Sequence, residues 1–104
     1  MFINEPAIQY LWNPTIDDGE PKPPEWFAKT IEFSLNALAQ PWTKVYVHCA
    51  AGVNRGPSSA YAVMLALGWD GPTALALIKE RRPTAQVGYA KDADVAVVTL
   101  GYVL

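Results

Sequence analysis

The chain has 104 residues, of which 51% are hydrophobic and 17% are charged, a composition that excludes a disordered protein and leaves room for one hydrophobic core. We therefore expect a single domain over residues 1–104. The net charge is −2, and the eight Lys and Arg residues are scattered apart from one adjacent pair, which argues against binding to nucleic acid or an anionic membrane. The sequence has neither a membrane-span pattern nor a leader pattern, and we expect a cytoplasmic protein.

The first predicted elements are a strand and a loop. Residues 7–12 mix β-forming side chains with rough alternation, and Asn13-Pro14 after them is a turn signal. Residues 15–24 contain three prolines, one glycine and three acids, which is typical of an exposed loop. Loops of this kind often carry functional side chains.

Helical patterns dominate the rest of the chain. Apolar residues three to four positions apart, beginning with Phe27, Ile31 and Leu35, predict the first helix. Residues 44–48 are β-branched and aromatic and predict a second short strand. In total we expect four helices, over residues 25–40, 58–67, 72–82 and 92–104.

This order of elements predicts an α/β fold, namely a reduced sheet with helices packed on it and the active site at the carboxyl ends of the strands. Only two strands are clear, and fewer than three strands seldom form a stable sheet alone. Such a sheet has unpaired edges and an uncovered apolar face. We therefore also expect self-association, most simply as a homodimer.

Cys49 is the only cysteine, so it cannot form an internal disulfide and is a buried filler, a ligand or a reactive thiol. It lies in a loop between the second strand and a helix, with the sequence His48-Cys49-Ala50-Ala51-Gly52-Val53-Asn54-Arg55. A glycine-bearing loop at a helix N-terminus directs backbone N–H groups to one point, where the helix dipole adds positive potential. Such a point binds phosphate and also stabilises a thiolate. The loop therefore favours a nucleophilic Cys49 beside a bound phosphate.

Two further groups are needed for phosphate transfer. Arg55 follows Cys49 by six residues, and its planar guanidinium can hold two phosphate oxygens while charge shifts. A thiolate alone cannot expel an alkoxide or phenoxide, so a general acid is required. Asp17 and Asp18 are the candidates, because their loop ends at the same predicted sheet edge, although either can be an ordinary solvated turn residue. His48, the only histidine, is interpreted as support for the loop rather than as a general base.

The pattern His48-Cys49-x-x-Gly52-x-x-Arg55 resembles the signature of the protein tyrosine and dual-specificity phosphatase superfamily, and the strand before it and the helix after it strengthen the match. The segment Asp17-Asp18-Gly19-Glu20-Pro21 is similar to the family's acid loop, Asp-x-Gly-x-Pro, and Asp17 precedes Cys49 by 32 residues. Residues 78–83 are similar to a helix end in these domains. The resemblance extends over roughly residues 10–83.

This resemblance implies hydrolysis of phosphate monoesters through a phosphocysteine intermediate, with Cys49 as the nucleophile and Arg55 as the phosphate ligand. It singles out Asp17 over Asp18 as the acid that protonates the leaving group and then activates water. No metal and no cofactor are expected, because the loop and the arginine supply the positive charge. The phosphate cradle would be completed by backbone N–H groups of Ala50, Ala51, Gly52, Val53, Asn54 and Arg55.

The sequence departs from the family pattern in two features. The residue after the loop arginine is usually serine or threonine, whose hydroxyl assists departure of the cysteine sulfur, but here it is Gly56. We therefore expect slow breakdown of the phosphocysteine unless Ser58 or Ser59 supplies the hydroxyl. Family domains also have about three strands before the acid loop, whereas some sixteen residues precede it here. The fold is accordingly expected to be truncated at its N-terminus relative to the family.

The substrate is the least specified part of the function. The loop side chains between Cys49 and Arg55 are neutral, so we expect phosphotyrosine in a phosphorylated protein, or a small aryl phosphate ester, rather than a highly anionic head group. A phosphoglucan is the alternative, because Arg55-Gly56-Pro57 is similar to the Arg-Ala-Pro of glucan-directed members and Trp12 is a candidate pocket wall. Two hypotheses come from other classes: a pseudophosphatase that binds phosphoprotein without turnover, and a rhodanese-type sulfurtransferase, which needs no upstream acid.

Overall fold

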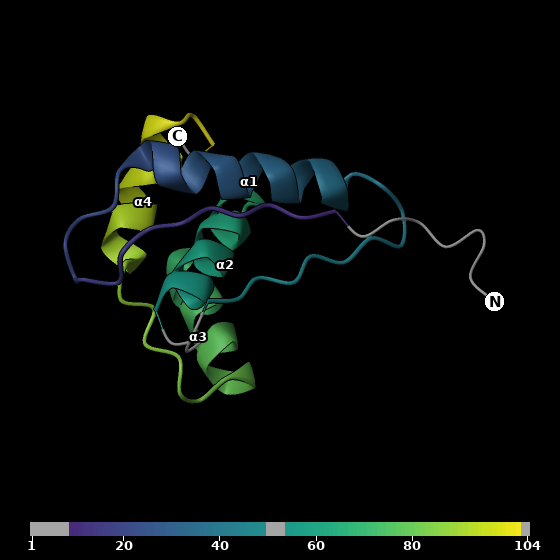
Figure 1. Ribbon diagram of the computed structural model, residues 1–104. Coiled ribbons are helices and arrows are strands. Elements are labelled where there is room, and N and C mark those ends of the chain that lie inside the picture. The colour runs from purple at the N-terminus through teal and green to yellow at the C-terminus, as the bar shows by residue number, and fades with distance from the viewer. Residues whose placement is uncertain (1–8, 50–53, 103–104) are drawn as a thin grey trace.

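The computed structural model describes residues 9–49 and 54–102. Helices α1, α2 and α4 all contact one another, whereas α3 packs mainly on α2. In Figure 1, α1 lies across the top of the molecule, α2 lies beneath it and α3 is at the bottom. None of the helices in this part of the chain is long and apolar enough to span a membrane. Four helices are described, α1 (Pro24–Leu38), α2 (Arg55–Ala66), α3 (Gly71–Arg81) and α4 (Ala90–Thr99).

The hydrophobic core is formed chiefly by α1, α2 and α4. Phe27 and Ile31 of α1 are at most 1% exposed, and Ala62 of α2 is fully buried. Helix α4 contributes the small, fully buried side chains of Ala93 and Ala96, which allow neighbouring helices to approach closely. Removing a large apolar side chain from water stabilises the fold by about 1.5–3 kcal/mol. Burial of Phe27 and Ile31 therefore holds α1 firmly on the other two helices.

The predicted helices are present with shifted ends, and the two largest shifts, at the start of α2 and the end of α4, have local reasons. Helix α2 begins at Arg55, three residues before the predicted start at 58, because Pro57 lies in the first turn, where a missing N–H costs nothing. Helix α4 ends at Thr99 because Gly101 adopts a positive φ of 83°. The Gly101 and Tyr102 amides then bond back to the carbonyls of Val98 and Val97, at 3.1 Å and 2.9 Å, which is a Schellman ending.

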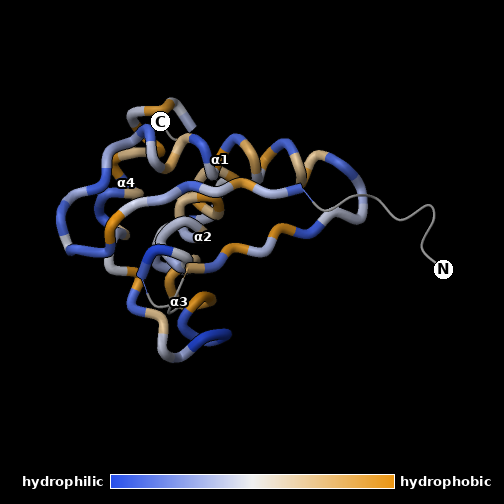
Figure 2. Tube along the Cα trace, in the orientation of Figure 1, coloured by the Kyte–Doolittle hydropathy of each residue, from blue (hydrophilic) through white to orange (hydrophobic). Residues whose placement is uncertain are grey.

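The predicted α/β sheet is wrong for the part of the chain that the structure describes, because residues 9–49 and 54–102 contain no β-strand. Residues 44–48 are extended and alternate between exposed and half-buried positions, and Figure 2 shows the same alternation in hydropathy. Residues 9–12, the described part of the first predicted strand, also run as an extended trace, in the same direction across Figure 1. A strand requires a neighbour that accepts and donates its backbone hydrogen bonds. Neither segment has such a ladder here, whereas helices satisfy their backbone groups locally.

Candidate active site

The end of the extended segment 44–48 packs directly against the start of α2. A Cβ atom built on Gly56 would lie 3.2 Å from the Cys49 amide nitrogen and 3.2 Å from the His48 carbonyl carbon. Gly56 is not among the glycines with a positive φ angle. Glycine is therefore favoured here by the close approach of two backbone segments. This contact holds Cys49, which is half-buried, beside the first turn of the helix.

The phosphate loop is only partly described by the structure. Asn54 and Arg55 are described, and α2 begins at Arg55 with its positive dipole end directed toward the loop. The proposed N–H donors of Ala50, Ala51, Gly52 and Val53 lie outside the described residues. Their part in a phosphate cradle stays a prediction.

Arg55 directs its guanidinium toward the loop that carries the candidate acids. Its Nη1 donates a hydrogen bond to the carbonyl oxygen of Thr15 at 3.1 Å. Its Nε is buried and has no acceptor among the described residues. A buried donor without an acceptor is costly, by about 1–3 kcal/mol and more for a charged group. The guanidinium is thus anchored through one nitrogen, while a second donor can serve an anion.

Asp17, in the acid loop, lies beside the N-terminal end of α2. Its Oδ2 is 3.5 Å from Nδ2 of Asn54, the residue immediately before Arg55. Oδ1 of Asn54 accepts a hydrogen bond from the Gly88 amide at 3.2 Å. Asn54 therefore links the acid loop, the start of α2 and the segment before α4. The acid loop thus meets the described end of the second loop, Asn54 and Arg55, through side-chain hydrogen bonds and not at a sheet edge.

Asp18 is engaged by a different set of groups. Its Oδ1 accepts hydrogen bonds from Lys22 Nζ at 2.7 Å and from the Glu20 amide at 3.0 Å. The Lys22 hydrogen bond, followed by that of Glu20, lowers the pKa of Asp18 below its usual value. Lys22 is only 7% exposed, and its ammonium also donates to the Ile16 carbonyl oxygen. Asp18 thus serves as an ionised partner for a buried lysine, which makes it a poor proton donor.

His48 is exposed at the end of the extended segment. Its ring stacks on that of Tyr46, with ring centroids 5.3 Å apart and an angle of 28° between the planes. The two residues are separated by one position, as expected for side chains on the same side of an extended chain. In the structure the His48 ring therefore stacks on an exposed tyrosine. That His48 supports the loop stays a prediction.

The sequence analysis did not assign Tyr89 to the site. Tyr89 Oη donates a hydrogen bond to Asp17 Oδ1 at 2.6 Å, and the Gly19 amide donates to Tyr89 Oη at 3.1 Å. The Tyr89 amide donates to Oγ of Ser58 at 3.0 Å. Ser58, considered above only as a hydroxyl for the thiol, is fully buried. Since 72 residues separate Tyr89 from Asp17, no local sequence pattern indicates their contact.

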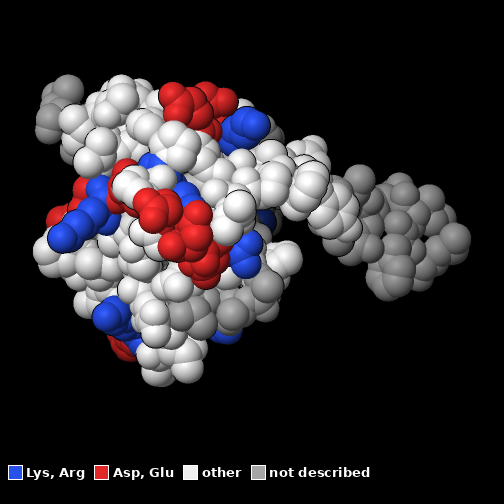
Figure 3. Space-filling view, turned by 60° about the vertical axis from the view of Figure 1, so that its left-hand side comes forward, with Lys and Arg blue, Asp and Glu red and all other residues white. Residues whose placement is uncertain are grey.

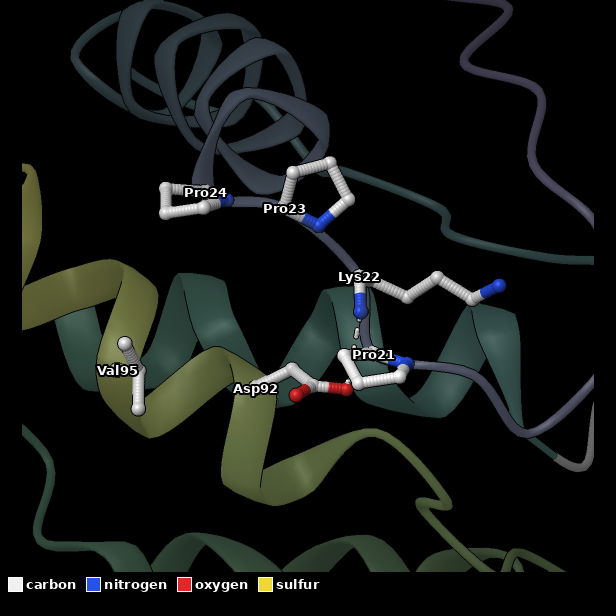
Figure 4. Close-up of a pocket in the computed structure, with 6 residues that line it drawn as sticks. All are labelled: Pro21, Lys22, Pro23, Pro24, Asp92 and Val95. Carbon is white, nitrogen blue, oxygen red and sulfur yellow. Dashed lines mark hydrogen bonds between the residues drawn. The ribbon is translucent and has the colours of Figure 1, made fainter.

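The acid loop is exposed beside a shallow pocket at the start of α1. Figure 3 turns this side of the molecule forward and shows carboxylates gathered with basic side chains between them. In Figure 4 the Lys22 ammonium points away from the pocket, and the Lys22 amide donates to Asp92 Oδ2 at 3.1 Å. That bond fastens the acid loop to α4. The pocket has a volume of about 400 Å³ and is lined by Pro21, Lys22, Pro23, Pro24, Asp92 and Val95.

Comparison with known proteins identifies the family of this site. Within residues 9–49 and 54–102, no group of three or more His, Cys, Asp or Glu side chains is arranged to hold a metal ion. No curated protein and no solved structure matches the chain. The family model described as dual specificity phosphatase, catalytic domain, matches residues 1–90, which confirms the resemblance and supports a phosphatase function in general. The chain therefore belongs to the dual specificity phosphatase catalytic domain family.

Proposed function

We propose that the protein hydrolyses phosphate monoesters through a phosphocysteine intermediate, with Cys49 as nucleophile, Arg55 as phosphate ligand and Asp17 as general acid. The observation that carries this proposal is the hydrogen-bond distance of 3.5 Å between Asp17 and Asn54. This hydrogen bond holds a carboxyl group near the N-terminal end of α2, where a phosphate would bind. Family membership supports the same reaction class.

In the first step the Cys49 thiolate attacks phosphorus. An S–P bond forms as the bond from phosphorus to the leaving oxygen breaks, and Asp17 donates a proton to that oxygen. Positive potential at the N-terminus of α2 favours both the thiolate and the phosphate. Arg55 donates hydrogen bonds to phosphate oxygens, and these strengthen as charge develops during transfer.

The geometry of Arg55 supports its role as the phosphate ligand. Nη1 is bonded to the Thr15 carbonyl oxygen at 3.1 Å, which fixes the plane of the guanidinium. The buried Nε has no acceptor among the described residues, and a phosphate oxygen is an acceptor of suitable charge. The same arginine therefore couples the acid loop to the bound anion.

In the second step water attacks the phosphocysteine. The Asp17 carboxylate takes a proton from the attacking water, the S–P bond breaks, and inorganic phosphate and the Cys49 thiolate are released. No hydroxyl is present at position 56 to assist the departing sulfur, because the residue is Gly56. We propose that this step limits turnover.

The proposed substrates are aryl phosphates, above all phosphotyrosine in a phosphorylated protein. Asn54, the described loop side chain that hydrogen-bonds the acid, is neutral, which suits a monoester better than a multiply charged head group. The phosphoglucan alternative is supported by Trp12, which is 85% exposed next to the acid loop and offers a surface on which a sugar ring can stack. Phosphate release from phosphotyrosyl peptide and from phosphorylated amylopectin compares the two substrates directly.

The decisive experiment is release of p-nitrophenol from p-nitrophenyl phosphate by the purified chain and by Cys49→Ser. We expect turnover by the wild type and loss of at least about 10³-fold in the variant, since the alcohol is a far weaker nucleophile at neutral pH. A wild type that binds phosphotyrosyl peptide without turnover would instead be a pseudophosphatase. Sulfur transfer from thiosulfate to cyanide that survives Asp17→Ala would indicate a sulfurtransferase.

A further inference from the structure

The hydroxyl of Tyr89 joins the candidate acid to the backbone of its own loop. It donates to Asp17 Oδ1 at 2.6 Å and accepts from the Gly19 amide at 3.1 Å. We propose that Tyr89 is the positioning residue of the general acid: its hydroxyl holds Oδ1 of Asp17, so that Oδ2 carries the proton delivered to the leaving group. This inference rests on the function proposed above, because it specifies how that same acid is held.

The direction of the hydrogen bonds assigns the two carboxyl oxygens different roles. A phenol has one proton, and the Gly19 amide donates into the Tyr89 oxygen, so the phenol proton is directed at Asp17 Oδ1. Burial, followed by the hydrogen bond to Asp17, raises the pKa of Tyr89, which keeps this donor protonated. Oδ2 is the oxygen on the Asn54 side, toward the start of α2. It is therefore the oxygen that faces a bound phosphate ester.

Tyr89 is itself held rigidly. Its side chain is 3% exposed, and its amide donates to the buried Oγ of Ser58 in α2. The residue before it, Gly88, donates to Oδ1 of Asn54. Two consecutive residues thus fasten both sides of the site: Gly88 holds the end of the phosphate loop, and Tyr89 holds the acid. A fixed carboxyl group close to its target is what efficient proton transfer requires.

The test is Tyr89→Phe, which removes the hydroxyl and keeps the ring. Tyr61→Phe is the matched control, because Tyr61 is also buried and donates to a carboxylate, Asp94 Oδ1, at the same distance of 2.6 Å. The substrates are phenyl phosphate, whose leaving group needs protonation, and 2,4-dinitrophenyl phosphate, whose leaving group does not. We expect Tyr89→Phe to lower kcat/KM for phenyl phosphate about tenfold and for the dinitrophenyl ester less than about threefold. Tyr61→Phe should leave kcat/KM unchanged for both substrates.

A double mutant separates positioning from a general structural effect. If Tyr89 acts through Asp17, adding Tyr89→Phe to Asp17→Asn should lower phenyl phosphate turnover by less than about twofold further. Equal losses on both substrates in Tyr89→Phe, or a full additional loss in the double mutant, would overturn the proposal.

Hydrogen exchange at Gly19 keeps the test independent of activity. In Tyr89→Phe the Gly19 amide loses its acceptor and should exchange at least about tenfold faster, whereas Tyr61→Phe should leave it unchanged. A wild type without phosphatase activity, but with this change at Gly19, would contradict the proposed function alone. Unchanged Gly19 exchange in Tyr89→Phe would contradict the positioning of the loop by Tyr89, whatever the activity.

Discussion

Lys22 Nζ lies 2.7 Å from Asp18 Oδ1, while the neighbouring carboxylate of Asp17 accepts a hydrogen bond from Tyr89. Two adjacent acids of one loop are therefore held in different environments. The ammonium of a buried lysine keeps Asp18 ionised, whereas the partners of Asp17 are a neutral phenol and the neutral side chain of Asn54. This difference supports a proton-transfer role for Asp17 and a structural role for Asp18.

Replacement of each acid by its amide should separate these two roles. We expect Asp17→Asn to slow the turnover of phenyl phosphate by about 10²-fold or more, the usual weight of general acid catalysis. Asp18→Asn should slow it less than about threefold, since that carboxylate is held ionised by Lys22. Steady-state kinetics at pH 6–7 measures both. A larger loss in Asp18→Asn than in Asp17→Asn would show that the acid is assigned one residue too early.

The Lys22–Asp18 pair should make stability depend on pH in a defined window. Because the pKa of Asp18 is lowered from 3.8 in the folded state, its contribution is complete above about pH 5 and is lost as the pH falls through the lowered value. Because the pKa of Lys22 is raised above 10.5, the stabilisation by the ion pair is also lost as the pH rises through that raised value. Thermal unfolding should therefore show a lower Tm for Asp18→Asn than for the wild type at pH 7. The difference should shrink below pH 4, and a pH-independent difference would contradict the ion pair as its cause.

Side chains at position 56 should destabilise the fold, because a Cβ atom there lies 3.2 Å from backbone atoms of His48 and Cys49. We expect both Gly56→Ala and Gly56→Ser to lower the free energy of unfolding by about 1–3 kcal/mol, as overpacking does. Urea titration followed by circular dichroism measures this loss. Two variants as stable as the wild type would show that the backbones separate without cost.

The same two variants isolate the effect of the absent hydroxyl on catalysis. The wild type should release a burst of p-nitrophenol before slow steady turnover, since breakdown of the phosphocysteine is limiting. Gly56→Ser should turn over about tenfold faster than Gly56→Ala, because a hydrogen bond to a charged sulfur is worth about 1.5 kcal/mol or more. Rapid-quench kinetics measures the burst. A wild type without a burst, whose rate depends on the leaving group, would show that phosphorylation of Cys49 limits turnover instead.

The extended segments at residues 9–12 and 44–48 should mediate self-association. The sequence analysis expected this association from the unpaired edges of the predicted sheet. Trp42 is 99% exposed and Tyr46 86% exposed, and the described residues form no ladder along 44–48. We expect a homodimer in sedimentation velocity, and its weakening by Tyr46→Lys, because charged side chains on an extended edge oppose pairing. Val95→Lys is the control, since Val95 is an exposed apolar residue of α4, at 61%. A monomer at high micromolar concentration would contradict the prediction.

What could be predicted from the sequence depends on local spacing. The composition of residues 58–67 indicated a helix after the Cys49 loop, and α2 is present there, although it begins three residues earlier, at Arg55. The periodic apolar residues Phe27 and Ile31 indicated the buried face of α1, and both are buried. Helices and their N-terminal loops involve contacts within a few residues, so a single sequence carries enough information to find them.

Contacts between distant segments were decided only by the tertiary structure. The sheet was predicted wrongly because strand propensity is local, whereas strand pairing requires a partner that propensity does not supply. Likewise, spacing could not show that the Lys22 amide donates to Asp92, 70 residues away, or that Tyr89 reaches across 72 residues to Asp17. The sequence by itself determined the kinds of groups that can carry the chemistry. The packing of α4 against α1 and α2 decided which of these groups come into contact. Burial of distant apolar faces brings together side chains that no local pattern connects.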